Sequence, residues 1–104
     1  MIQRALEVRR TFEKFEQATV GKTWSRENLA QGFVVDVGDL MKLIMAKEGV
    51  RKIDDVDEKL AHELSDCLWS VIILAHMYEI NLEQEFVKNM ETLRAKIEAK
   101  LAAL

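Results

Sequence analysis

The chain has 104 residues, of which 49% are hydrophobic and 32% charged, with no proline, four glycines, one cysteine and a net charge of −3. This composition excludes disordered, collagen-like and disulfide-built chains, and its net charge gives little reason to expect nucleic-acid binding. The sequence also contains no apolar run long enough to span a membrane. We therefore expect a soluble, cytoplasmic, all-α single domain over residues 1–104.

The first half of the chain predicts two helices. The first covers about residues 2–17 and ends in segment 18–24, where β-branched residues and a glycine break the helical pattern. Ser25 is a good N-cap for the second helix. This helix runs to about Glu48, and Gly49 supplies its C-terminal stop.

The second half predicts two more helices. Asp54 or Asp55 caps the third, which runs to about Glu79, and the fourth takes Leu82 to near the end of the chain. The short connection after Gly49 predicts that the second and third helices are long and antiparallel. Both are apolar on more sides than one four-helix chain can cover, so we expect assembly into an oligomeric helical bundle.

Four acids interrupt the apolar pattern of the two central helices. Asp36 and Asp39 lie on the second helix, and Glu63 and Asp66 lie on the third. The i, i+3 spacing places both members of each pair on one face of their helix. Asp36 also falls in line with the leucines seven residues before and after it, so it lies in the middle of a core stripe.

Antiparallel pairing of the two helices can bring these four carboxylates together. An oxygen-only ligand set favours hard cations, Mg²⁺ or Mn²⁺. A di-iron site would need Glu-x-x-His pairs, and neither His62 nor His76 has a Glu three residues before it. The alternative is that the acids are solvated surface charges. The chain would then be a non-enzymatic helical oligomerisation module whose acids set pairing specificity.

The acids and their surroundings resemble the MazG-like nucleotide pyrophosphohydrolases, the all-α NTP pyrophosphatase superfamily. That family carries Glu-Glu-x-x-Glu on one helix and Glu-x-x-Asp on the next. The resemblance covers residues 22 to about 82, and the segments that carry it are 24–30, 35–40, 46–49 and 63–69. Val35 stands at the first Glu position of the family motif, and aspartates stand at the second and third.

The resemblance implies a metal set of Asp36, Asp39, Glu63 and Asp66, with Mg²⁺ as the cofactor and Mn²⁺ as a substitute. It also implies hydrolysis of a (deoxy)nucleoside triphosphate to the monophosphate and pyrophosphate, in the house-cleaning of nucleotide pools. Glu63 and Asp66 are the candidate catalytic residues, although the sequence does not single out the general base. The family's habit of pairing helical hairpins implies a homodimer at least and a homotetramer as the preferred expectation.

Five residues are candidates for substrate binding. Trp24, close to Lys22, either stacks on the base or packs at the start of the second helix. Trp69 lies one turn beyond the second acid pair, where it either walls the pocket or packs in the core. Asn89 and Arg94 on the fourth helix either reach the phosphates or sugar or belong to a solvated face.

Overall fold

The computed structural model describes all 104 residues as four α-helices joined by short segments, which confirms the all-α prediction. The helices are α1 (Ile2–Thr19), α2 (Arg26–Lys47), α3 (Val56–Met77) and α4 (Leu82–Ala102). The chain divides into two compact units, Met1–Leu74 and Ala75–Leu104. None of the helices combines the length and the apolar character that crossing a membrane requires.

Both ends of α2 are fixed by local hydrogen bonds. The Ser25 hydroxyl accepts from the Asn28 N–H at 3.2 Å, and the Asn28 side chain accepts from the Ser25 N–H at 3.0 Å, which forms a capping box. At the other end Gly49 adopts a φ of 81°. The Val50 N–H then donates to the Met45 carbonyl at 2.9 Å, a Schellman closure that turns the chain toward α3.

The end of α3 differs slightly from the sequence-based expectation. We expected this helix to reach about Glu79, but it ends at Met77 because Glu79 takes a φ of 58°. The Ile80 N–H donates to the Ala75 carbonyl at 2.8 Å, so the helix closes as α2 does, but with a glutamate at the left-handed position. The Asn81 side chain then accepts from the Gln84 N–H and caps α4.

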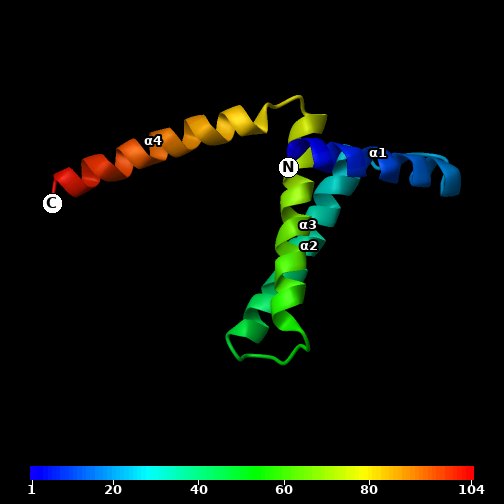
Figure 1. The fold of residues 1–104 in the computed structure, drawn as a ribbon, viewed down its shortest axis with the longest axis horizontal. Helices are drawn as coiled ribbons and strands as arrows, with labels where there is room; N and C mark the ends of the chain where they lie inside the picture. Colours follow the sequence, from blue (N-terminus) through cyan, green and yellow to red (C-terminus); the bar gives the residue numbers. More distant parts are fainter. The chain divides into compact units, whose positions relative to one another are not determined.

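Helices α2 and α3 form an antiparallel hairpin, and α1 crosses the end of that hairpin away from its connecting loop (Figure 1). The crossing is fixed by contacts of α1 with α3: the Trp69 indole N–H donates to the Ala5 carbonyl at 3.1 Å, and the Phe12 and Trp69 rings lie 5.8 Å apart. Few side chains of the chain are fully buried. The buried apolar ones are Ala5, Leu29, Leu43, Ile72, Ile73 and Ala75.

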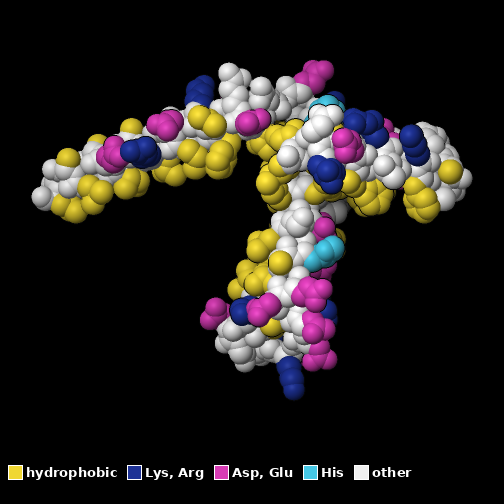
Figure 2. Space-filling view, viewed as in Figure 1, with side chains coloured by type: hydrophobic (Ala, Val, Ile, Leu, Met, Phe, Trp, Pro, Cys, Tyr) yellow, Lys and Arg dark blue, Asp and Glu magenta, His cyan; other side chains and the backbone are white.

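Helix α4 makes up most of the second unit and buries none of its residues. Its large apolar side chains recur every three or four positions, and Figure 2 shows hydrophobic atoms gathered along one edge of this helix. An unburied stripe with helical spacing indicates a surface that packs against another helix. The residues of this stripe are Phe86, Met90, Leu93, Ile97 and Leu101.

Candidate metal centre and substrate cavity

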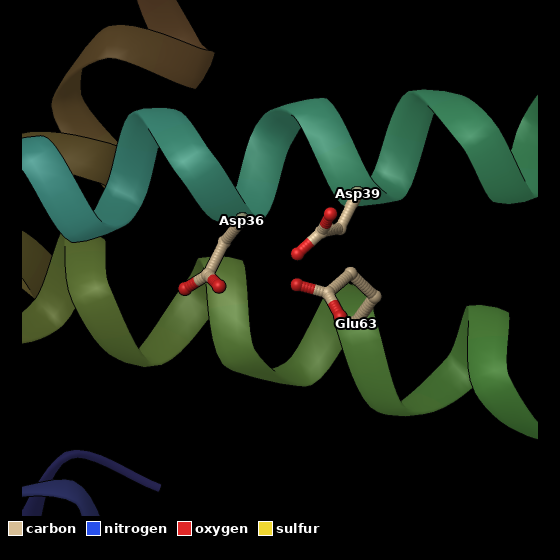
Figure 3. A group of neighbouring side chains, drawn as sticks. All are labelled: Asp36, Asp39 and Glu63. Carbon is tan, nitrogen blue, oxygen red and sulfur yellow. The ribbon is translucent and has the colours of Figure 1, made fainter.

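Three carboxylates converge between α2 and α3. Asp36 and Asp39 lie one turn apart on α2, and Glu63 faces them from α3 (Figure 3). One oxygen of each lies within 4.8 Å of the other two, a spacing that small side-chain movements would close around a cation. Asp36 and Glu63 are half-buried and Asp39 is exposed. We call these three residues the carboxylate cluster.

The pKa of Glu63, the α3 member of the carboxylate cluster, is shifted from its ordinary value. Burial raises the pKa of its carboxyl group above the ordinary value. Neighbouring negative charges raise that pKa further, in decreasing order those of Asp36, Asp66 and Asp39. Its Oε1 atom is also buried without a hydrogen-bond partner. A bound cation would relieve both conditions, because it supplies a partner for the buried oxygen and cancels the repulsion.

Asp66 lies near the carboxylate cluster but makes a different contact. Its Oδ2 atom is 3.2 Å from Nε2 of His62, one turn earlier on α3. Its charge is close enough to act on both Glu63 and Cys67. The pKa of the Cys67 thiol is raised, mainly by burial and next by the charge of Asp36, so this thiol resists ionisation at neutral pH. The structure therefore brings three of the four expected ligands together and pairs the fourth with a histidine.

A cavity of about 580 Å³ opens beside the carboxylate cluster. Trp24, Trp69 and Phe12 supply its aromatic lining, and the carboxylates of Asp36 and Asp66 also line it. Both tryptophans expected at the substrate are thus brought to one cavity, although they are 45 residues apart in the sequence. Val35, at the first Glu position of the family motif, also lines this space. We call it the aromatic cavity.

A second cavity of about 590 Å³ lies on the other side of the carboxylate cluster. Asp39 and Glu63 line it, and so do the side chains of Lys42 and Lys59. Asp55 and Glu58 line this second cavity too, so its charges are of both signs, whereas the first cavity is largely aromatic and apolar. These lysines were not among the expected site residues, although each lies within one turn of an acid on its own helix, Lys42 after Asp39 and Lys59 before Glu63.

The other three substrate candidates lie outside both cavities. Lys22 is exposed in the connection between α1 and α2. Asn89 lines a shallow depression on α4, and Arg94 Nε lies 3.0 Å from Glu98 Oε1 on the same helix. Two residues that the sequence analysis missed, Arg9 and Glu16 on α1, do line the aromatic cavity.

Comparison with known families agrees with this geometry. The profile of the MazG nucleotide pyrophosphohydrolase domain matches residues 36–99, more than half of the chain. The chain belongs to the MazG family. Searches of curated proteins and of solved structures gave no match. The matched segment contains the whole carboxylate cluster and Asp66, whereas α1 and Trp24 precede it.

Membership of the MazG family makes nucleotide pyrophosphohydrolysis the activity of this chain at the family level. MazG domains typically use a divalent metal, and the carboxylate cluster is a donor set suited to one. All of its ligand atoms are carboxylate oxygens, and the unpartnered Oε1 of Glu63 is among the buried atoms of the site. The residues present therefore fit a hard divalent cation.

Proposed function

We propose that this MazG domain hydrolyses a (deoxy)nucleoside triphosphate to the monophosphate and pyrophosphate, with Mg²⁺ as cofactor and Mn²⁺ as a substitute. The observation that carries the proposal is the convergence of Asp36, Asp39 and Glu63, one of which, Glu63, also has a buried Oε1 atom without a hydrogen-bond partner. Such a cluster is costly unless a cation binds to it. We propose that the enzyme clears unwanted nucleotides from the pool in the cytoplasm.

Asp36, Asp39 and Glu63 would hold the cation, with Asp66 as a fourth acid from the same face of α3. When bound, such a metal neutralises phosphate charge and favours attack by water on phosphorus. The Oδ2 atom of Asp66 lies 3.2 Å from Nε2 of His62, its neighbour on α3. In this proposal, all four acids expected from the sequence take part in metal binding.

Glu63 is our candidate for the proton acceptor in the reaction. It is the α3 member of the carboxylate cluster, and a carboxylate positioned at the reacting water can act as a general base. In the proposed mechanism it takes a proton from the attacking water. Asp66, one turn later on α3, is the second candidate catalytic residue.

The two cavities suggest how the nucleotide is oriented. The base would enter the aromatic cavity, where Trp24 and Trp69 offer π-faces for stacking. The triphosphate would then pass the carboxylate cluster toward the second cavity, where Lys42 and Lys59 are the cationic side chains among several carboxylates. The substrate contacts expected of Lys22, Asn89 and Arg94 stay predictions, since none of the three lines either cavity.

We also propose that the chain works as a homodimer at least, with a homotetramer as the preferred state. The unburied stripe on α4 supports this, and so do the exposed apolar side chains of α2, among them Val34, Met41 and Met45. Light scattering at micromolar concentration should give a multiple of 12.0 kDa. Ile97→Glu should dissociate the assembly and Lys96→Glu, one residue earlier on α4, should not. A stable mass near 12.0 kDa for the parent chain would end this proposal.

A screen for pyrophosphate release over common and damaged nucleotides tests the proposed function. The expected products are a nucleoside monophosphate and pyrophosphate, with no product when Mg²⁺ is chelated. Asp66→Asn should lose activity while staying folded, and Asp57→Asn is the control because it removes only an exposed ion pair with Lys47. Release of inorganic phosphate and a diphosphate would show that the cleavage position is wrong. If no nucleotide is hydrolysed and no metal binds, the chain would be the non-enzymatic oligomerisation module instead.

A further inference from the structure

Arg9 on α1 is a charged residue in a buried position. Its side chain is 8% exposed, and its Nη2 atom donates a hydrogen bond of 2.9 Å to the carbonyl of Trp24. Carboxylate oxygens of Glu13 and Glu16 lie 3.6 and 3.8 Å from other nitrogens of the same guanidinium. A buried guanidinium needs such partners, because an unpaired charge in this environment would destabilise the fold.

Glu16 completes a two-point attachment of Trp24. Its Oε1 atom accepts a hydrogen bond of 2.9 Å from the Trp24 N–H and also faces Arg9. The backbone of Trp24 is therefore held on both sides, at its N–H by Glu16 and at its carbonyl by Arg9. We call Arg9 and Glu16 the clamp. It acts across the connection between α1 and α2, a segment that helical structure does not hold in place.

The indole of Trp24 depends on this attachment because burial holds it only in part. The residue is 47% exposed. On one side its ring lies against Gly32, where an added Cβ would come within 3.1 Å of Trp24 Cζ3. On the other side it faces the aromatic cavity, which Arg9 and Glu16 also line. The clamp thus holds the backbone of Trp24, and the absence of a side chain at residue 32 leaves room for its indole.

We propose that Arg9 and Glu16 are positioning residues for the nucleobase, holding Trp24 so that its indole forms a fixed wall of the aromatic cavity. The inference rests on the proposed function, in which this cavity receives the base of a nucleoside triphosphate. A wall fixed before binding lowers the entropic cost of binding. The clamp should therefore govern substrate affinity and leave the chemical step at the carboxylate cluster unchanged.

The test follows the indole and the kinetics separately. Protein labelled with 5-fluorotryptophan should give two ¹⁹F resonances, one for each of the two tryptophans, and Trp24→Phe assigns them. Arg9→Met should shift or broaden the Trp24 resonance of the metal-free protein and leave that of Trp69 in place. With the nucleotide that the parent enzyme hydrolyses fastest, the same variant should raise KM about tenfold and keep kcat within about twofold.

Two milder variants keep the test valid if Arg9→Met folds poorly. Arg9→Lys retains the charge but cannot contact the Trp24 carbonyl and both carboxylates through a planar fork, so its KM should lie between those of the parent and Arg9→Met. Glu16→Gln keeps an oxygen for the Trp24 N–H and loses the charge opposite Arg9, so it should act in the same direction. Arg10→Met, an exposed neighbour on α1, is the control and should match the parent in both measurements.

Each outcome decides the proposal. An unmoved Trp24 resonance in folded Arg9→Met or Glu16→Gln would show that the clamp does not position the indole. A moved resonance with unchanged KM would show that the wall is not used in binding, and a fall in kcat alone would assign the clamp to chemistry. If the parent hydrolyses no nucleotide, the proposed function fails and the assignment to the nucleobase fails with it, while the ¹⁹F spectra still decide whether the clamp holds Trp24.

Discussion

The carboxylate cluster and the clamp lie in the same unit, but their charges are arranged in opposite ways. The cluster gathers three like charges, and one oxygen of Glu63 is buried without a hydrogen-bond partner. In the clamp, the buried charge of Arg9 faces two carboxylates and a carbonyl. A cluster of like charges is suited to bind a cation, whereas a charge that faces opposite charges is suited to hold a neighbouring group still.

The two regions also differ in their relation to the MazG domain. The cluster lies within the matched segment 36–99, while Arg9, Glu16 and Trp24 all precede it. The proposed reaction chemistry thus falls within the segment that matches the MazG model. A wall of the adjoining cavity is supplied by the preceding helix and connection. This separation teaches that changes in α1 can alter recognition without touching the carboxylates.

The largest effect should come from Glu63→Gln. The amide keeps the shape of the side chain but removes both the negative charge and the capacity to accept a proton from water. We expect kcat to fall at least about 10²-fold, the lower bound for loss of a positioned base. Pyrophosphate release at saturating Mg²⁺ measures it, with Glu91→Gln on α4 as the control. Turnover equal to that of the parent would exclude Glu63 from the chemistry.

Metal binding should stabilise the parent protein and not a variant of the cluster. At a Mg²⁺ concentration of 100 times Kd, the free energy of unfolding should rise by about 2.7 kcal/mol. Thermal unfolding with Mg²⁺ and with a chelator measures this difference. Asp36→Asn should lose most of the stabilisation, whereas Arg9→Met should keep all of it. Equal stabilisation of the parent and Asp36→Asn would place the metal elsewhere.

A smaller effect is expected on the side of the aromatic cavity. Trp69→Phe keeps an aromatic ring near Phe12 but removes the N–H that donates to the Ala5 carbonyl. The free energy of unfolding in urea should fall by about 1 kcal/mol, the usual contribution of one hydrogen bond. Metal stabilisation should stay as in the parent. A loss of metal stabilisation in this variant would mean that the two regions are coupled.

The smallest effect concerns pH in the absence of metal. The pKa of Glu63 is raised in the folded protein, so the folded state holds this proton more tightly than the unfolded chain does. Its contribution should therefore lower stability as pH rises from the ordinary value of 4.5 through the raised pKa. The melting temperature of Glu63→Gln relative to the parent should increase over that range. A constant difference would show that Glu63 titrates normally.

Much of the hairpin could be predicted from the sequence because its signals are local. Ser25 and Gly49 mark the ends of α2, and the i, i+3 spacing of the acids needs only helical geometry. An antiparallel pairing then brings Asp36 and Glu63 to the same place. The pairing of Asp66 with His62 was not predicted, because an i, i+4 contact depends on the side-chain conformation chosen in the folded protein.

The clamp could not be predicted from the sequence. Arg9 and Trp24 are 15 residues apart on different elements, and their contact depends on how α1 crosses the hairpin. Helical periodicity gives the buried face of a helix but not its crossing angle or its partner. Arg9 also resembles an ordinary surface arginine in an N-terminal helix that is rich in charge. Nothing in its neighbours signals that it is buried.

A crystal structure with Mn²⁺ and a non-hydrolysable nucleoside triphosphate analogue tests both regions in one measurement. The anomalous signal of Mn²⁺ should lie among the carboxylates of Asp36, Asp39 and Glu63. The base should lie in the aromatic cavity against Trp24, with the triphosphate directed toward the cluster. A metal bound away from these carboxylates, or a base outside that cavity, would contradict the division between chemistry in the hairpin and recognition beside α1.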